Sequence, residues 1–523
     1  MKICLIEPPV PFAQPEEQSY EQNKYLFPNI SMGYIGAVLE KEKYDVDIIE
    51  CPGQNISSKK LYQIIEEKQY DMIGFITYYF DAEFALINLS RVIQKIKKRA
   101  PLAYIFAGGY LASLCPEKLL NEIVGIDCCV IGEAEMTCLE LVQHIEQGKN
   151  TQDVLGIAYK NQEQIIINEP RHYIENLDEL PFPKRAFIHE KYPVATIISS
   201  RGCYGKCKFC VDRELYSKNN CYKIRYRSPQ NVVAEIEYLV KNHQIKKILF
   251  CDDNFLGNSI LKKQWLKDFC DLMKEKQMNI TFRIDSRAND VIACKDNINL
   301  LKEVGLVCIY VGVETFLQEQ LDYYGKGVTV EQNIKAIEIV RDANLQLKYG
   351  FIMLQPYTTL EEISKNIRIL KELEIYKYSH PCQDLHLAGI RRLFAPPGIE
   401  LNTQLKEQQL ESENKFHYDF VDEKVSLFYT IALEWKERFN KYIPLYYLYN
   451  KAELNGTKDV VKQLINGNEE VKKLDLMFTE ELCQKILNNE ISSKNDSYNL
   501  LVTWEDMIKD IFYSYDAIRS LAM

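Results

Sequence analysis

The sequence has little glycine or proline and no long apolar stretch. Glycine and proline contribute 22 + 18 = 40 of its 523 residues, which excludes a collagen-like or low-complexity chain. No stretch approaches the ~18 uninterrupted apolar residues of a membrane span. The apolar start before Pro8 is too short for a secretory signal. We therefore expect a cytoplasmic protein without a membrane partner.

An excess of positive charge is also lacking. The chain has 64 Lys and Arg residues against 74 Asp and Glu residues, a net charge of −10. Such a surface repels phosphate backbones and anionic lipids, so we expect no nucleic-acid partner. At about 150 residues per domain, the length predicts about three domains.

The N-terminal part, residues 1–149, alternates short apolar runs such as KICLIEPP, VDIIEC and DMIGFITYY with helical periods. This alternation predicts a doubly wound α/β domain with a parallel sheet. Ligands of such domains bind at the carboxyl ends of the strands. The residues that we place at these ends are Glu7, Tyr78, Gly108, Gly109, Tyr110, Gly132 and Glu133. The glycines either admit a bulky ligand or relieve turn strain.

The rest of the chain divides into three further parts. Residues 150–192 are turn-rich and predict a linker or a small hairpin. Residues 193–400 contain six strand-helix units, fewer than the eight of a closed barrel, which predicts a partial (β/α)6 barrel. Residues 401–523 show helical periods only and predict a helical C-terminal region.

Three of the 16 cysteines form a motif. Most of the others, such as Cys4, Cys128, Cys129, Cys251 and Cys308, lie in apolar runs and are expected to be small buried hydrophobes. Cys203, Cys207 and Cys210 follow the strand-like run ATIISS with Cx3Cx2C spacing. Three thiolates on one loop can hold a cubane iron-sulfur cluster and leave its fourth iron open. Cys221 could supply a fourth ligand to an electron-transfer cluster or a zinc site, and a chance triplet is a further alternative.

The cysteine motif resembles that of the radical S-adenosylmethionine (SAM) superfamily. The resemblance implies that the open iron of a 4Fe-4S cluster binds SAM, whose reductive cleavage yields a 5′-deoxyadenosyl radical. It implies that Phe209 lies along the adenine. It also implies that Asp252 and Asp253, which end the second barrel strand, engage the methionine amine; two acids there could instead cap the next helix.

Later barrel strands extend this resemblance. Ser286 and Arg287 end the third strand, where an arginine could pair with a carboxylate in bidentate fashion. The run YVGVETFLQEQLDYYGKG resembles the fourth-strand signature, which implies that Glu314 accepts hydrogen bonds from the ribose and Lys326 meets the methionine carboxylate. The fifth strand departs from the family pattern, because Leu354 and its neighbours replace a second glycine and a Pro-Gly turn.

The α/β domain ahead of the barrel resembles the cobalamin-binding domain of B12-dependent radical SAM enzymes, through GEAE at 132–135 and FAGGYLAS at 106–113. The implied cobalamin-binding residues are Tyr78, Gly108, Gly109, Tyr110, Gly132 and Glu133. The Asp-x-His-x-x-Gly loop of cobalamin mutases is absent, because no histidine precedes His144. We therefore expect no histidine from this domain on the lower face of the corrin.

Together these features predict a cobalamin-dependent radical SAM enzyme. The expected reaction is methylation of an unactivated carbon or phosphorus of a small metabolite or modified peptide, with flavodoxin or ferredoxin as a low-potential electron donor. Alternatives are an enzyme without methyl transfer, catalysing ring contraction, cyclisation or C–C coupling, and a non-enzymatic sensor. His386 and Tyr357 could contact substrate in the barrel mouth, although a satisfied core histidine is an equal reading of His386.

Overall fold

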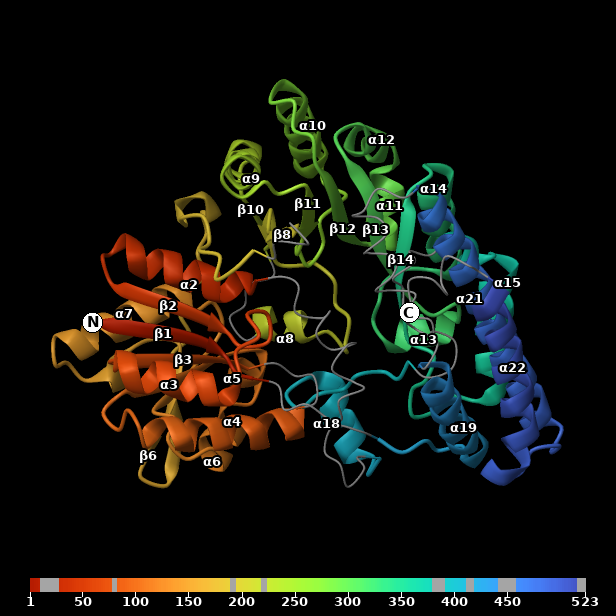
Figure 1. Ribbon diagram of the computed structural model, residues 1–523, viewed down its shortest axis with the longest axis horizontal. Coiled ribbons are helices and arrows are strands. Elements are labelled where there is room, and N and C mark those ends of the chain that lie inside the picture. The colour runs from red at the N-terminus through yellow and green to blue at the C-terminus, as the bar shows by residue number, and fades with distance from the viewer. Residues whose placement is uncertain are drawn as a thin grey trace. The chain divides into compact units, whose positions relative to one another are not determined.

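A computed structural model describes residues 1–9, 28–77, 82–188, 194–217, 223–378, 391–410, 418–440 and 458–514 (Figure 1). Tyr78, Cys221 and His386 lie outside these residues, so the predictions for them are unchanged. The chain forms two compact units. The first comprises Met1–Phe255, Gln264–Phe282 and Ala395–Thr403; the second comprises Leu256–Lys263, Arg283–Phe394 and Gln404–Met523.

A seven-stranded sheet organises the N-terminal part of the first unit, with strand order β2-β1-β3-β4-β5-β6-β7. Strands β1 to β5 pair in parallel, and β6 and β7 form an antiparallel hairpin at its edge. The bounds are β1 Lys2–Glu7, β2 Asp45–Glu50, β3 Met72–Thr77, β4 Tyr104–Gly109, β5 Cys128–Val130, β6 Ile157–Asn161 and β7 Gln164–Ile167. The hairpin lies in the interval 150–192 that the sequence marks as a linker or small hairpin.

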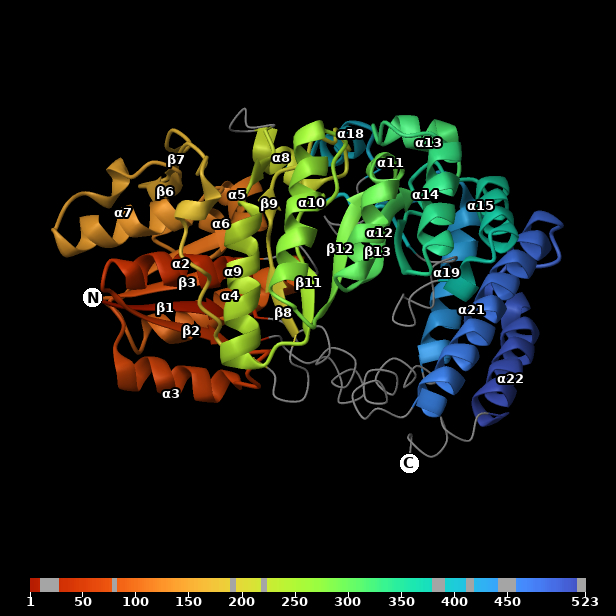
Figure 2. The ribbon, with the colours of Figure 1, turned by 90° about the horizontal axis from the view of Figure 1, so that it is seen from above.

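Helices cover both faces of this sheet. Its helices are α2 Ile30–Lys41, α3 Ser58–Lys68, α4 Ala82–Lys97, α5 Tyr110–Leu114, α6 Pro116–Glu122 and α7 Glu135–Glu146. Helices α2 and α7 lie on one face, and α3 and α4 lie on the other (Figures 1 and 2). Strand β1 is therefore buried at every position after Lys2, as expected for a parallel strand covered on both sides. The strand order is that of a doubly wound fold, as predicted.

A second sheet has the strand order β14-β13-β12-β11-β8. Its strands are β8 Val194–Ile197, β11 Lys247–Phe250, β12 Thr281–Arg287, β13 Leu306–Glu314 and β14 Gln346–Phe351. The pairs β8-β11 and β13-β14 are parallel. Strands β9 Ser200–Arg201 and β10 Arg225–Tyr226 form a small antiparallel pair. Of the predicted sixth strand, the end is described, where Arg392 forms a parallel bridge with Leu354.

The helices that follow these strands are α8 Val211–Ser217, α9 Pro229–His243, α10 Ile260–Glu275, α11 Ala288–Ala293, α12 Lys295–Glu303, α13 Gln318–Tyr323, α14 Val330–Asp342, α15 Leu360–Glu372 and α16 Ile375–Tyr378. This strand-helix alternation confirms the predicted α/β class.

The end of the chain is helical, as predicted, with α18 Glu400–Glu407, α19 Glu423–Asn440, α21 Lys458–Leu487 and α22 Tyr498–Ser514. Helices α19, α21 and α22 pack on one another, and α21 also packs on α15. Trp435 stacks on Phe478 with ring centroids 4.1 Å apart, and its indole N–H donates to Asp475 at 2.9 Å. Among the described residues, no helix is both long and apolar enough to cross a membrane.

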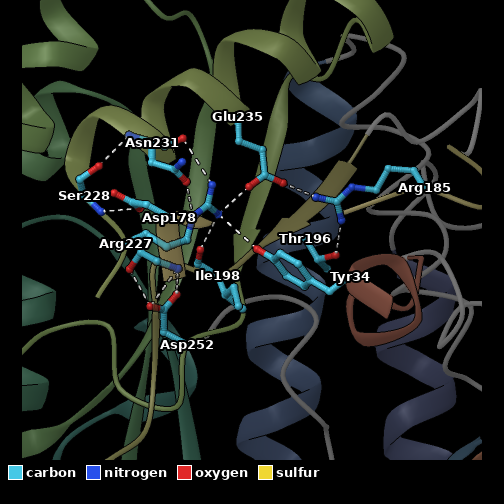
Figure 3. A network of polar contacts seen from close by, with 11 residues as sticks. Tyr34, Asp178, Arg185, Thr196, Ile198, Arg227, Ser228, Asn231, Glu235 and Asp252 are labelled. Atoms are coloured by element: carbon cyan, nitrogen blue, oxygen red, sulfur yellow. Dashed lines mark hydrogen bonds and ion pairs between the residues drawn. The ribbon is translucent and has the colours of Figure 1, made fainter. Parts of the chain in front are cut away.

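A buried polar network in the first unit joins α9 to the segment that precedes the second sheet (Figure 3). At its centre, the Glu235 carboxylate accepts from Arg185 at 2.7 Å and from Arg227 at 2.5 Å. All three side chains are at most 5% exposed. Arg185 also donates to Thr196 on β8, and Arg227 donates to the Tyr34 hydroxyl on α2. The network thus connects α2, which covers the first sheet, with α9 and with β8 of the second sheet.

Removal of the Glu235 carboxylate would leave two guanidinium groups buried without their counter-charge. We expect Glu235→Gln to lower the free energy of unfolding by about 3–5 kcal/mol, measured by urea denaturation of the full chain. Glu237→Gln on the same helix is the control, because the Glu237 ion pairs involve side chains at least 23% exposed; it should change stability little. Equal losses in the two variants would contradict a special role of this network.

Candidate functional site

The three motif cysteines lie on the loop between β9 and α8. Gly202, just before them, adopts φ +101°, a left-handed conformation that favours glycine. Cys207 is buried, whereas Cys203 and Cys210 are partly exposed. The Gly205 N–H donates to the Cys203 sulfur at 3.3 Å, and the Cys210 N–H donates to the Cys207 carbonyl at 3.1 Å. Helix α8 begins at the next residue and closes the loop.

This loop fits an iron-sulfur cluster. The three cysteines are thiols and not disulfides, and an N–H···S hydrogen bond of the kind that Gly205 makes is a feature that tunes cluster thiolates. In the described part of the chain, no three His, Cys, Asp or Glu side chains converge on a single metal ion. A cluster does not need such convergence, because each thiolate binds a different iron.

Asp252 and Asp253 support this loop and do not cap a helix. The Asp252 carboxylate accepts from the Ser199 and Ser200 hydroxyls, each at 2.6 Å. Asp253 accepts from the Gly202 N–H at 2.8 Å and from the Tyr216 hydroxyl at 3.1 Å. The residue that caps α10 is Ser259, whose hydroxyl accepts from the Lys262 N–H. The capping alternative is therefore wrong, and a role toward SAM remains a prediction.

Asp212 connects the cysteine loop to the first sheet. One of its oxygens accepts from the Cys210 thiol at 3.7 Å, and the other accepts from the Tyr110 hydroxyl at 2.7 Å. Tyr110 begins α5, directly after β4. Charge repulsion from Asp212, together with burial, raises the pKa of Tyr110, so its hydroxyl stays protonated and donates. Tyr110, predicted as cover for a flat ligand, thus also contacts helix α8, which follows the loop of the motif cysteines.

Two hydroxyl groups organise the carboxyl edge of the first sheet. Thr77 donates to the Gly108 carbonyl at 2.7 Å. Ser113 donates to the Gly109 carbonyl at 2.8 Å and accepts from the Gly132 N–H at 3.0 Å. A Cβ built on Gly108 would meet no atom of the described residues within 4 Å, so these residues leave open space above it. The edge has room for a ligand that contacts backbone, which fits the predicted cobalamin site.

Glu133, at the same edge, forms ion pairs with two arginines. The two Arg225 terminal nitrogens bond its two oxygens at 2.7 and 3.0 Å, and Arg201 lies at 3.2 Å. Burial would raise the pKa of Glu133, but Arg225 and Arg201 hold it below its ordinary value. Both arginines belong to the small β9-β10 pair that leads into the cysteine loop. A direct contact of Glu133 with cobalamin remains a prediction.

His144 is engaged away from the strand ends. It lies in α7, where its Nδ1 is 2.7 Å from the Asn150 carbonyl and its Nε2 is 3.8 Å from Glu140. These contacts tie His144 to its own helix and to the turn that follows it.

In the second unit, three of the predicted SAM-binding residues lie together at the carboxyl ends of β12 and β13. The Lys326 ammonium bonds Glu314 Oε1 at 2.7 Å, in a pair that is at most 11% exposed. The Arg287 guanidinium donates to the Lys326 carbonyl. Ser286, which precedes Arg287 in sequence, accepts from the Leu256 N–H at 3.3 Å. Phe209, Asp252 and Asp253 belong to the first unit.

Two glycines and a strained backbone make room for this ion pair. A Cβ on Gly312 would lie 2.6 Å from the Lys326 ammonium and 2.9 Å from Glu314 Oε1. A Cβ on Gly350 would lie 2.6 Å from the Tyr310 hydroxyl and 3.1 Å from Glu314 Oε2. Glu314 itself has φ +67°, which is costly for a side chain of its size. Such strain is typical of functional positions.

Comparison with known proteins agrees with this geometry. The B12 binding domain model matches residues 22–142, and the Radical SAM superfamily model matches residues 197–370. The chain is a radical SAM enzyme with a B12-binding domain. Its cofactors are accordingly a 4Fe-4S cluster, SAM and cobalamin.

Several relatives of this enzyme are known. An uncharacterized methyltransferase of Pyrococcus horikoshii is 28% identical over 384 residues, which are 72% of this chain and 79% of the relative. An anaerobic magnesium-protoporphyrin IX monomethyl ester cyclase of Rubrivivax gelatinosus is 26% identical over 358 residues, 66% of this chain and 62% of the relative. The structure of the cobalamin-dependent radical SAM enzyme OxsB aligns with a TM-score of 0.79 at 18% identity, covering 99% of this chain and 80% of OxsB, and therefore shows a common fold.

Sequence reasoning missed the residues that support the site. Ser199 and Ser200 hold Asp252, Tyr216 holds Asp253, and Asp212 joins the cysteine loop to the first sheet. Asp212 alone could have been noticed from the sequence, because it is an acidic residue two positions after the last motif cysteine. Tyr357, predicted to contact substrate, is 40% exposed and bonds Gln408 through its hydroxyl. A cysteine prediction was wrong as well, because Cys251 is exposed.

Two buried glutamates end adjacent strands at the carboxyl edge of the first sheet. Glu7 and Glu50 are register partners on β1 and β2, and they are 7% and 1% exposed. Glu50 Oε2 accepts from the Asn29 N–H at 2.8 Å, and Oε1 has no hydrogen-bond partner among the described residues. Burial, with repulsion from Glu7, raises the pKa of Glu50 to about 8. The folded enzyme therefore keeps Glu50 protonated near neutral pH.

This protonation predicts how stability depends on pH. Between the ordinary pKa of a glutamate and about pH 8, the folded state holds a proton that the unfolded state has lost. The free energy of unfolding is therefore highest below this pH range. It falls as pH rises through the range, by at most about 1.4 kcal/mol per pH unit. Glu50→Gln should flatten this fall in urea unfolding measured from pH 5 to 8. The exposed Glu67→Gln on α3 should reproduce the wild-type slope; an unchanged slope in Glu50→Gln would refute the assignment.

Proposed function

We propose that this enzyme methylates an unactivated carbon or phosphorus of a small metabolite or modified peptide. One observation carries the proposal. The hydroxyl of Tyr110, at the carboxyl edge of the B12-binding sheet, donates to Asp212, two residues after the last motif cysteine, within one compact unit. This arrangement supports two cofactors that act on one substrate. The Pyrococcus horikoshii relative, named as a methyltransferase, supports methyl transfer.

Different residues of the first unit would hold the cluster and cobalamin. Cys203, Cys207 and Cys210 would hold the cluster, and the edge at Gly108 and Gly109 would hold cobalamin. When bound, the cluster and SAM supply a 5′-deoxyadenosyl radical, and cobalamin supplies the methyl group. A radical is needed because acid-base groups do not ionise an unactivated C–H bond near neutral pH.

Side chains of the second unit would bind the charged parts of SAM. Lys326 would meet its carboxylate, and Glu314 would accept hydrogen bonds from its ribose hydroxyls. Each of these two groups already has the other as a partner at 2.7 Å. SAM therefore has to share or replace that contact, and the pair keeps both charges in place before SAM arrives.

A second candidate is the same chemistry without methyl transfer, because the Rubrivivax gelatinosus relative is named as a cyclase. The product mass separates the two reactions. Anaerobic incubation with SAM, cobalamin, a low-potential reductant and candidate substrates chosen from the functions of neighbouring genes should give a product heavier by one CH2 if the enzyme is a methyltransferase. A product that has lost hydrogen, or shows only rearrangement, would replace the first candidate by the second.

We predict that Cys207→Ala abolishes cluster binding but spares cobalamin. After anaerobic reconstitution, the wild type should show a corrin band and a cluster shoulder in its visible spectrum and form 5′-deoxyadenosine on reduction with SAM. Cys207→Ala should keep the corrin band, lose the shoulder and form no 5′-deoxyadenosine. Cys251→Ala, at an exposed cysteine outside the motif, should behave as the wild type. Zinc bound through Cys221 in the wild type would refute the proposal.

We also predict that Gly312→Ala weakens SAM binding. The added methyl group would press on the flexible end of Lys326, so the ion pair should move while the fold persists. Loss of one well-placed charged contact should lower the affinity for SAM about tenfold in equilibrium dialysis. Cys308→Ala, four residues away on the same face of β13, is the control. Unchanged affinity in Gly312→Ala would remove Lys326 and Glu314 from the SAM site.

A further inference from the structure

A short segment that follows the barrel strands belongs to the first unit. Ala395–Thr403, which we call the strap, is part of that unit, whereas the residues on either side of it belong to the second. Within the strap, Ile399 and Leu401 are each 1% exposed. The Asn402 side chain donates to the Ala395 carbonyl at 3.1 Å. The strap is therefore fixed by packing and by a hydrogen bond of its own.

The strap lies against the B12-binding domain at Gly398. This glycine has φ +92°, in the left-handed region that other residues rarely adopt. A Cβ on it would lie 2.9 Å from Leu114 Cβ and 3.1 Å from Cys115 Sγ, too close for a side chain. Leu114 is the last residue of α5, the helix whose Tyr110 donates to Asp212 on α8. The strap and α8 therefore contact the same helix of the B12-binding domain.

Two residues after Gly398, the strap reaches the loop of the motif cysteines. Glu400 Oε2 lies 2.8 Å from Arg213 Nη1, and Glu400 Oε1 lies 3.7 Å from Lys208 Nζ. Lys208 precedes Cys210 within the motif, and Arg213 follows it in the first turn of α8. One carboxylate thus contacts two cations that flank the last motif cysteine.

These ion pairs contribute little to stability. The three side chains are between 24% and 35% exposed, and ion pairs of this kind are worth about 0–1 kcal/mol. Glu400 is also the first residue of α18, where a carboxylate favours the helix by a similar amount. Holding the fold therefore gives Glu400 only a small role, and its place beside the motif directs attention to the electrostatics of the cluster.

Charge near an iron-sulfur cluster changes its reduction potential. Reduction adds one negative charge to the cluster, so nearby cations favour it and a nearby carboxylate opposes it. Lys208 and Arg213 would make the cluster easier to reduce, and the Glu400 carboxylate offsets that effect. A more easily reduced cluster passes its electron on less readily, and SAM is cleaved by accepting that electron.

We propose that Glu400 is a positioning residue that lowers the reduction potential of the cluster through Lys208 and Arg213. It takes the three motif cysteines as the cluster ligands and rests on the proposed function to that extent. It does not depend on methyl transfer, because both candidate reactions use the same cluster. The strap thus has a part in the radical chemistry although it lies far from the motif in sequence.

A redox titration of the full, anaerobically reconstituted enzyme without SAM tests this proposal, followed by the EPR signal of the reduced cluster. Glu400→Gln should raise the equilibrium constant for cluster reduction about three- to tenfold, seen as a more positive midpoint potential. Glu400→Asp, which keeps the charge, should stay near the wild type. Arg213→Gln should shift the potential in the opposite direction. Both shifts should shrink at high salt, because these side chains are partly exposed.

Glu407→Gln is the matched control. It removes the same charge from an exposed residue about two turns further along α18, and it should keep the wild-type potential. Thermal unfolding should be nearly the same in Glu400→Gln, Glu407→Gln and the wild type, since the ion pairs of Glu400 add little stability. A merely structural role of Glu400 would change unfolding and leave the potential as it is.

Two results would overturn the proposal. One is the same potential in Glu400→Gln and Glu407→Gln; the other is a shift of Glu400→Gln and Arg213→Gln in the same direction. If Glu400→Gln assembled no cluster, Arg213→Gln would decide, and a potential no more negative than that of the wild type would reject the proposal. A wild type without a cluster would instead reject the assignment of the cluster to the three cysteines, and with it the proposed function.

Discussion

The first unit depends on carboxylates that are buried between pairs of arginines. Glu235 holds Arg185 and Arg227, and Glu133 holds Arg225 and Arg201. Burial makes these contacts close to all-or-none, because any arrangement that separates the charges leaves one of them desolvated. Arg201 and Arg225 form the strand pair that leads into the cysteine loop. The loop is therefore placed against the B12-binding sheet by charge pairing as well as by packing.

Hydrogen bonds to the backbone complete this placement. Asp253 fixes the Gly202 N–H before the first motif cysteine, and Thr77 and Ser113 fix the glycine carbonyls at the sheet edge. In the second unit, polar groups are placed by glycines whose missing side chains leave room for them. Gly312 and Gly350 leave room for the Glu314-Lys326 pair, and Glu314 accepts an unfavourable backbone conformation there. Both arrangements hold polar groups in place before a ligand binds, which lowers the entropy cost of binding.

Period and spacing in the sequence predicted the fold and the cysteine motif because both signals are local. The alternation of apolar runs in residues 1–149 predicted the doubly wound sheet, and the Cx3Cx2C spacing predicted the loop. Contacts between distant residues left no such signal. Asp212 and Tyr110 are 102 residues apart, and Glu133 and Arg225 are 92 apart. Cys251 was misjudged because an apolar run shows that a strand is buried but not where its burial ends.

The bond between Tyr110 and Asp212 has a consequence for how such enzymes can be recombined. The tyrosine lies in the B12-binding domain and the aspartate in the radical SAM domain, beside a motif cysteine. A chimera that takes the N-terminal domain of one relative and the barrel of another would connect the two domains covalently. It would not by itself preserve this hydrogen bond. Partners at both positions would have to be exchanged together to keep this hydrogen bond between the two domains.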